Sequence, residues 1–203
     1  MRVSANSVWL EQGVGLDIVI NDQNATVEDL MQVYGAASDD VDLQKEQRFF
    51  PAVEPHGTCF GCTYCCHRFN IFLSRLDVIR LAAAESVSPR EFMAFCTVYE
   101  PWKVDRRRLV DPGRYCLRDD DQGCGKYADR PLICRLFICC PHTARAKRLI
   151  GEVNRLAEEE LVNWRMGQLD KTNPFNERCS YSQVLLKECV DADLWQELFQ
   201  LEQ

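Results

Sequence analysis

The chain is organised around one short stretch in which four thiols follow the spacing C-x2-C-x2-C-C: Cys59-Phe60-Gly61-Cys62-Thr63-Tyr64-Cys65-Cys66. A hydrophobic core does not need this pattern, because a buried cysteine packs as an ordinary small apolar residue. Metal binding does need it, since a C-x2-C turn brings two sulfurs to one side of the backbone. Gly61 suits the tight turn that this requires. The stretch therefore predicts a metal site.

A second set of thiols begins fifty residues after Cys66. We predict that two half-sites come together around metal and contribute eight thiols: Cys59, Cys62, Cys65, Cys66, Cys116, Cys124, Cys134 and Cys139. The adjacent thiols of Cys65 and Cys66 point in divergent directions in most backbone conformations. They therefore suit two metal ions, or a bridging role, better than one simple tetrahedral site.

The composition limits the function classes. The chain has 203 residues, of which 46% are hydrophobic, so we expect one folded domain. Its net charge of −7 argues against binding nucleic acid, which rests on accumulated lysine and arginine. No run of 18 apolar residues is present, and the N-terminus lacks the apolar stretch of a secretory signal. We expect a cytoplasmic protein without membrane contact, in which the twelve cysteines stay reduced, and a protein or redox partner.

An iron–sulfur cluster is the first candidate for the metal site. Cys59, Cys62 and Cys65 have the C-x2-C-x2-C spacing with which bacterial ferredoxins bind three irons of one cluster. The ferredoxin run continues with x3-C-P, whereas this chain has Phe69 at that position. The fourth ligand would then come from the second set, where Cys124, Cys134 and Cys139 are available.

Structural zinc is the alternative, because eight thiols can form two four-thiolate sites, and such a zinc module would mediate protein or nucleic-acid contacts. Thiol catalysis without metal is less favoured, since no thioredoxin-like pattern surrounds Cys65 and Cys66. We interpret His67, His56 and His142 as residues that are not metal ligands. Because no nucleophile or general base can be identified with an orienting partner, the sequence predicts no catalytic mechanism.

The fold class that we predict is α-rich, with minor short strands, in one irregular domain centred on the metal. Its parts would be an N-terminal extension (1–55), a cysteine-cluster domain (56–141) and a C-terminal helical segment (142–203). Helices are expected from a capping box at Thr26 to Tyr34, from Ser74 to Glu85, from Ser88 onward, after Asp129-Arg130-Pro131, from Thr143 onward, and from Ser180 to Leu201. A strand is expected at 15–20, and the run Arg106-Arg107-Arg108 is interpreted as the edge of a hairpin.

Three cysteines are interpreted as packing residues: Cys96, Cys179 and Cys189. In the helix after Ser74 we expect Leu76, Ile79 and Ala83 to form the buried face.

With these residues in view, the chain resembles the YkgJ-like cysteine-cluster proteins, whose shared region is described as a zinc- or iron-chelating CxxCxxCC domain. The resemblance rests on Cys59 to Cys66, on the helix that begins at Ser74, and on the run Cys124-Gly125-Lys126-Tyr127-Ala128-Asp129-Arg130-Pro131-Leu132-Ile133-Cys134-Arg135. It covers roughly residues 56–141.

The resemblance implies a metal-binding domain. One branch, the flagellin lysine N-methylase, implies methyl transfer that depends on an iron–sulfur cluster. Carried over by position, the metal-associated thiols would be Cys59, Cys62, Cys65, Cys66, Cys116, Cys124 and Cys134. The chain departs from the family's C-R-x-F-P pattern, because Cys139 and Cys140 follow Ile138 before a proline at 141.

Overall fold

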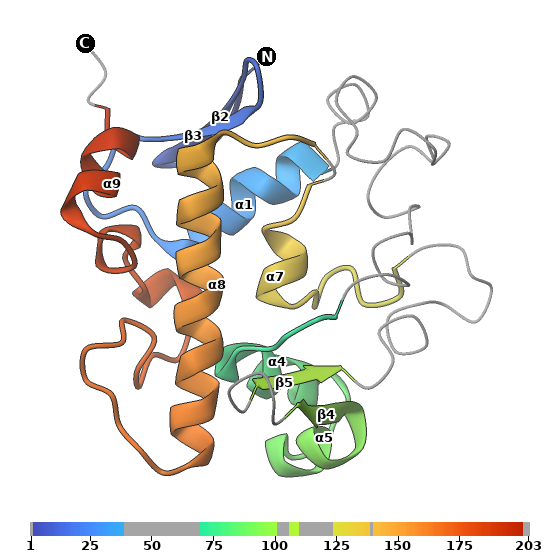
Figure 1. The fold of residues 1–203 in the computed structure, drawn as a ribbon. Helices are drawn as coiled ribbons and strands as arrows, with labels where there is room; N and C mark the ends of the chain where they lie inside the picture. The colour runs from blue at the N-terminus through green and yellow to red at the C-terminus, as the bar shows by residue number, and fades with distance from the viewer. Residues whose placement is uncertain (1, 39–69, 101–105, 110–123, 139, 201–203) are drawn as a thin grey trace.

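A computed structural model describes residues 2–38, 70–100, 106–109, 124–138 and 140–200 (Figure 1). Within these ranges the chain is rich in α-helix and has short strands in two small sheets, which confirms the predicted fold class. The helices are α1 (Val27–Ser38), α4 (Arg75–Ala84), α5 (Pro89–Cys96), α7 (Leu132–Arg135), α8 (Ala144–Arg165) and α9 (Ala192–Leu198). The strands are β1 (Arg2–Ala5), β2 (Val8–Gln12), β3 (Leu16–Ile20), β4 (Thr97–Glu100) and β5 (Arg106–Leu109). The position of a metal at the centre of the domain stays a prediction.

The N-terminal strands form an antiparallel sheet in the order β1-β2-β3. β3 confirms the strand expected at 15–20, whereas β1 and β2 were not predicted. Ala5 pairs with Val8, and the tight turn between them places Asn6 at a φ of 50°, in the left-handed region that asparagine tolerates. Val8 and Leu10 are buried, so this hairpin presents apolar side chains to the interior.

Helix α1 begins at the predicted capping box. The Thr26 backbone N–H donates to Asp29 Oδ2 over 2.9 Å, and the Asp29 N–H donates to Thr26 Oγ1 over 3.2 Å. The expected end at Tyr34 is wrong, because the helix continues through Gly35 to Ser38. A glycine lowers helix propensity by about 1 kcal/mol but does not stop a helix whose next residues are alanines, one of them buried (Ala37).

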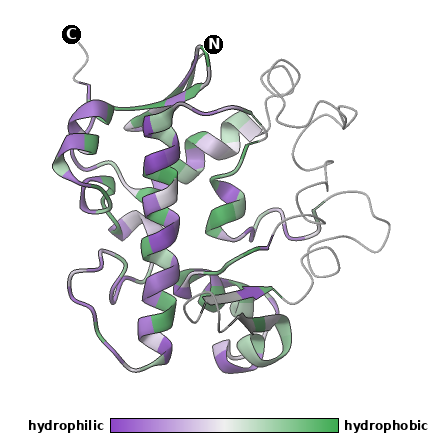
Figure 2. Cartoon of the chain, viewed as in Figure 1, coloured by the Kyte–Doolittle hydropathy of each residue, from purple (hydrophilic) through white to green (hydrophobic). Residues whose placement is uncertain are grey.

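Helix α8 runs along the length of the fold, with α9 on one side and α1 and α7 on the other (Figure 1). It begins at the predicted cap, where the Ala146 N–H donates to Thr143 Oγ1. Hydrophobic and hydrophilic residues alternate along it (Figure 2), and its apolar side is buried at Leu149, Val153 and Leu161. No helix within the described ranges is long and apolar enough to cross a membrane.

The C-terminal segment differs from the single helix expected over 180–201. It contains the 3-10 turns η2 (Tyr181–Gln183) and η3 (Leu186–Glu188), followed by α9. Between the turns the chain is extended, because its backbone binds the segment before α1. The Val27 N–H donates to the Val184 carbonyl, and the Leu186 N–H donates to the Ala25 carbonyl, both over 2.9 Å. These two bonds compete with helix formation and interrupt it.

The described residues form two hydrophobic cores. The main core is formed by buried residues of β2, β3, α1, α7, α8 and the segment 175–198. The small core consists of Ile71, Leu73, Val78, Leu81, Ala82, Phe92, Leu109, Cys124 and Leu161.

Helix α4 lies between the two cores, with Leu76 in the main core and Val78 and Leu81 in the small one. The buried face predicted for α4 was therefore wrong at two of its three residues, since Ile79 and Ala83 are exposed and only Leu76 is buried. Because α4 contacts one core on each of two sides, its buried residues do not fall on the single apolar face that the prediction assumed.

The hairpin of β4 and β5 confirms the interpretation of the arginine run 106–108 as a strand edge. Thr97 pairs with Leu109 in an antiparallel register. Leu109 is fully buried, and its N–H donates to the Ile71 carbonyl over 3.0 Å. The hairpin thus packs against the segment that leads into α4.

Candidate metal centre

The structure describes two of the eight predicted metal-binding thiols. Cys124 is 8% exposed and belongs to the small core, and Cys134 is half-buried and packs against the same core. The other six lie outside the described residues: Cys59, Cys62, Cys65, Cys66, Cys116 and Cys139. The structure therefore brings Cys124 and Cys134 to one small core and does not test the remaining assignments.

The segment 124–135 carries both thiols on a series of turns. The Asp129 N–H donates to the Lys126 carbonyl over 3.0 Å, and the Cys134 N–H donates to the Pro131 carbonyl over 2.9 Å. Pro131 caps α7, as expected, because proline fixes a backbone angle that suits the entry to a helix. Cys134 follows within the first turn.

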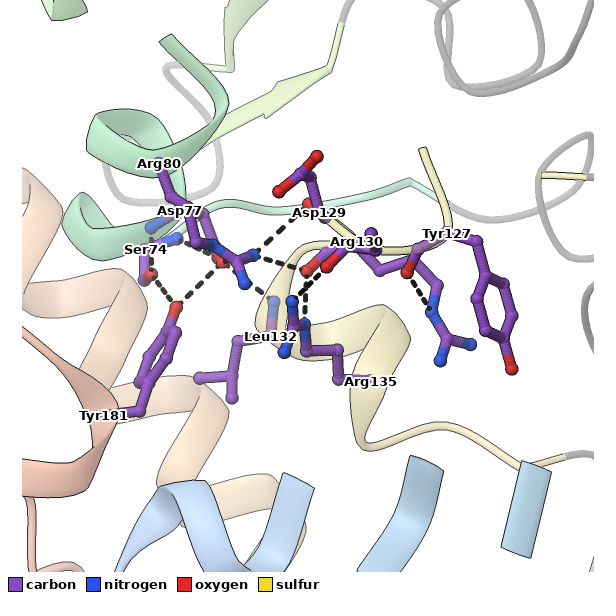
Figure 3. Close-up of polar contacts among 10 residues, drawn as sticks. Ser74, Asp77, Arg80, Tyr127, Asp129, Arg130, Leu132, Arg135 and Tyr181 are labelled. Atoms are coloured by element: carbon purple, nitrogen blue, oxygen red, sulfur yellow. Dashed lines mark hydrogen bonds and ion pairs between the residues drawn. The ribbon is translucent and has the colours of Figure 1, made fainter. Parts of the chain in front are cut away.

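A buried carboxylate binds this segment to α4. Asp77 has no exposed surface and closes the capping box of α4, where the Ser74 N–H donates to Asp77 Oδ2 over 3.0 Å. Its other oxygen, Oδ1, accepts the Leu132 N–H over 3.0 Å and the Tyr181 hydroxyl over 2.8 Å (Figure 3). Burial, together with the charge of Asp77, raises the pKa of Tyr181 well above its ordinary value, so this hydroxyl stays a donor.

Arginines extend the same contact. Arg80 on α4 donates through Nη2 to the carbonyl of Arg130 over 2.6 Å and to that of Asp129 over 3.2 Å (Figure 3). Arg135 donates through Nε to the Arg130 carbonyl over 2.9 Å. The Arg130 guanidinium lies over the Tyr127 ring, 3.7 Å from its centroid. Three arginine side chains thus fix the backbone between Cys124 and Cys134.

Among the described residues, the arginines of this cluster are only partly paired at close range, although the charges of Glu28 and Asp77 also act on Arg135. There, Arg80 has an ion-pair partner in Asp77 at 3.5 Å, whereas Arg130 and Arg135 have none. Burial lowers the pKa of Arg135, and the charge of Arg80 adds to this effect. A site in which several thiolates bind one zinc ion or one iron–sulfur cluster carries net negative charge. The arginine surplus therefore fits such a site electrostatically.

No complete metal site is present within the described ranges. They bring together no group of three histidine, cysteine, aspartate or glutamate side chains that could bind an ion. A site built on Cys124 and Cys134 would need further ligands from the cysteines that lie outside these ranges.

The cysteines interpreted as packing residues divide into two kinds. Cys189 is buried in the main core, where burial raises its pKa to about 12, and half-buried Cys96 packs against the small core. Both confirm the interpretation. Cys179 contradicts it, because this side chain is exposed in the loop before η2. Cys140, left unassigned by the sequence, is buried in the main core.

Sequence reasoning missed the partners of Asp77. The capping box identified Asp77 as a helix-start residue, but Leu132 and Tyr181 lie 55 and 104 residues further along the chain. No local pattern announces such contacts. The sequence contains one indication that Asp77 is buried, because this acidic residue lies between the apolar residues Leu76 and Val78.

Comparison with known proteins gives one match. The family model CxxCxxCC, described as "Putative zinc- or iron-chelating domain", matches residues 58–180. The match continues past residue 141, where the resemblance seen in the sequence ended, and includes α8. No curated protein and no solved structure matches the chain. Since the matched region is more than half of the chain and includes both cysteine sets, this protein belongs to the CxxCxxCC family of zinc- or iron-chelating domains.

Proposed function

We propose that the protein holds an iron–sulfur cluster bound by thiolates from both cysteine sets, and that it uses the cluster for electron transfer or for modifying a protein substrate. Cys59, Cys62 and Cys65 would be three ligands, and one of Cys124, Cys134 and Cys139 would be the fourth. The cluster would supply one-electron redox chemistry. A redox protein or a protein substrate would then be the partner.

One observation supports the proposal that the two cysteine sets bind the same cluster. Helix α4 begins nine residues after Cys66, and it binds the segment between Cys124 and Cys134 through Asp77 and Arg80. Because the Asp77 carboxylate is fully buried, this contact excludes water and is costly to break. The chain thus holds the flanks of both cysteine sets together before any metal is considered.

The choice of iron rests on the spacing of the first set. Three thiols at C-x2-C-x2-C match the ligand spacing of a cubane cluster. Zinc stays the alternative, since the family is described as zinc- or iron-chelating.

The test is metal and acid-labile sulfide content, with a visible spectrum, on protein purified without oxygen. Iron with matching sulfide and broad absorption near ~400 nm is the expected result, because thiolate-bound iron absorbs visible light. Zinc in stoichiometric amount, without colour and retained against added iron, would overturn the cluster and leave a zinc module.

Matched alanine variants locate the ligands. If Cys124 or Cys134 is the fourth ligand, changing that residue to alanine should lower the iron content, whereas Cys189→Ala should leave it unchanged, since Cys189 lies in the main core. All three changes remove a buried or half-buried thiol, so their cost to packing is similar. Equal iron loss in all three would mean that unfolding, rather than ligand loss, releases the metal.

A further inference from the structure

Two arginine side chains meet at one backbone oxygen, which belongs to a third arginine. Arg80 Nη2 donates to the Arg130 carbonyl over 2.6 Å, and Arg135 Nε donates to the same oxygen over 2.9 Å (Figure 3). The two guanidinium groups therefore lie within a few ångströms of each other, and their like charges repel. The fold thus brings cations together at the entry to α7, which is unfavourable unless an anion binds beside them.

The carboxylates near this cluster leave most of the arginine N–H groups unused. Asp77 lies 3.5 Å from Arg80 Nη2, which is long for a hydrogen bond, and its oxygens already accept bonds at the starts of α4 and α7. Asp129 contacts Arg80 through its carbonyl oxygen. The charge of Glu28 acts on Arg135, but among the described residues Arg135 has no ion-pair partner. None of these carboxylates offsets the cluster at hydrogen-bond distance.

Several N–H groups of the cluster have no acceptor in the described part of the chain. Arg80 Nε is buried and has no hydrogen-bond partner there. Arg130 is 9% exposed, and of its nitrogens only Nε has an acceptor there, the Tyr127 carbonyl at 3.2 Å. A buried donor without an acceptor is costly, and more so when the group is charged. The unused donors therefore indicate a ligand that accepts hydrogen bonds and carries negative charge.

We propose that Arg80, Arg130 and Arg135 bind a phosphate group, either as free phosphate or as part of a small phosphorylated ligand. A guanidinium group donates to phosphate oxygens in pairs, which uses N–H groups that the protein leaves unbonded. Phosphate carries about −1.5 to −2 charges near neutral pH, so it offsets two arginines, whereas a carboxylate offsets one. The Arg80 side chain is 29% exposed, which gives the anion an approach from solvent. The inference goes beyond the proposed function, because it rests on the arginines alone and needs no metal.

The first test is equilibrium dialysis of the full chain against radiolabelled inorganic phosphate. The unchanged protein should bind one phosphate per chain at ~0.15 M chloride. Arg135→Gln should weaken binding at least tenfold. Arg155→Gln is the matched control and should leave the Kd unchanged, because it removes the same charge from an exposed arginine of α8 that pairs with Glu152 and Glu159. No binding by the unchanged protein, or equal weakening in both variants, would overturn the proposal.

Two further measurements separate binding from a loss of structure, since Arg135 also bonds to the backbone. Arg135→Lys keeps the charge but replaces the guanidinium fork by one ammonium group, and it should weaken phosphate binding at least threefold. In the unchanged protein, phosphate should slow hydrogen exchange in residues 124–135 and leave α1 unaffected. Binding that is as tight in Arg135→Lys, or exchange that does not change in 124–135, would overturn the site.

Competition identifies the source of the phosphate group. Displacement of the label by glycerol 3-phosphate at lower concentration than by unlabelled phosphate would support a phosphorylated small molecule, and the reverse order would support free phosphate. Acetate should displace the label at least tenfold less effectively than phosphate. Acetate that displaces it equally well would overturn the assignment, because a single negative charge would then be enough.

Discussion

The main core and the small core differ in what holds them together. Among the described residues, the main core has 28 buried members drawn from the sheet, α1, α7, α8 and the C-terminal segment, whereas the small core has nine. Cys124 belongs to the small core, and Cys96 and Cys134 pack against it. So few buried side chains supply little hydrophobic stabilisation on their own. The main core is the larger packed unit, and under the proposed function the small core would depend on metal bound by its neighbouring thiols.

Removing the metal should therefore separate the two cores, and this is the largest effect that we expect. Cys62→Ser, or chelation of the unchanged protein, should abolish hydrogen-exchange protection in α5 and in 124–131, while α1, α7 and the N-terminal half of α8 stay protected. Thiolate binding and folding are coupled, so loss of one ligand costs both metal and local structure. Peptide-resolved hydrogen exchange measures this directly. Uniform loss of protection in both cores would contradict the distinction, and a fully protected, metal-replete C62S would refute the ligand assignment.

The second largest effect that we expect is the loss of stability when Asp77, which connects the two cores, is replaced. Asp77 and Glu91 occupy the same position in the capping boxes of α4 and α5, but Asp77 alone also binds Leu132 and Tyr181. Asp77→Ala leaves these buried donors unpaired and should lower the free energy of unfolding by about 3 kcal/mol. Glu91→Ala is the matched control and should cost much less, because its carboxylate is exposed and, within the described ranges, bonds to Ser88 alone. Chemical denaturation monitored by circular dichroism compares them, and equal costs would show that only the caps matter.

Local signals in the sequence predicted much of the fold. Capping residues placed the starts of α1, α4, α5 and α8 correctly, because a helix start depends on neighbours within four residues. Segments whose conformation depends on distant parts of the chain could not be predicted in this way. Val184 and Leu185 are compatible with a helix, and only bonding to the segment at 25–27 makes them extended.

The candidate site shows the same limit. Cysteine spacing indicated metal chelation, and the family match supports it, but spacing gives neither the metal nor the full ligand set. Asp77 could be identified as a cap and not as the link between two cores, since its partners come from distant segments. Cys179 and Cys189 were both interpreted as packing residues, yet the first is exposed and the second buried, because tertiary packing decides between them.

Those two cysteines provide a smaller test of the comparison. Cys189→Ser places a hydroxyl in the main core and should cost about 1.5 kcal/mol, limited by the Leu185 carbonyl at 3.5 Å, which the hydroxyl can reach. Cys179→Ser, on the surface, should have no measurable cost. Metal content should be unchanged in both, as measured by elemental analysis beside thermal unfolding. Metal loss in either variant would mean that this cysteine is a metal ligand.

The smallest effect that we expect is the pH dependence of stability that arises from the contact between β3 and the start of α8. Arg145 Nη2 and the Thr143 hydroxyl donate to Asp17 over 2.6 and 2.7 Å, which joins the start of α8 to β3. Burial raises the pKa of Asp17, but the hydrogen bonds from Arg145 and Thr143 outweigh it, and the pKa is lowered below its ordinary value. A lowered folded pKa means that the ion pair contributes fully above the unfolded pKa of about 3.9 and is lost as pH falls through the folded value.

Asp17→Asn should therefore cost about 1 kcal/mol at pH 7, as expected for a partly exposed pair, and less at high salt. The difference in unfolding free energy between the two proteins should stay constant from about pH 7 to 5 and vanish below the folded pKa, since protonated Asp17 resembles asparagine. Denaturation curves over a pH series give this difference, and acid effects on the predicted metal-binding thiols are common to both proteins and cancel. A difference that persists at low pH would mean that the asparagine side chain disturbs packing, and that charge pairing contributes nothing to the junction of α8 with the sheet.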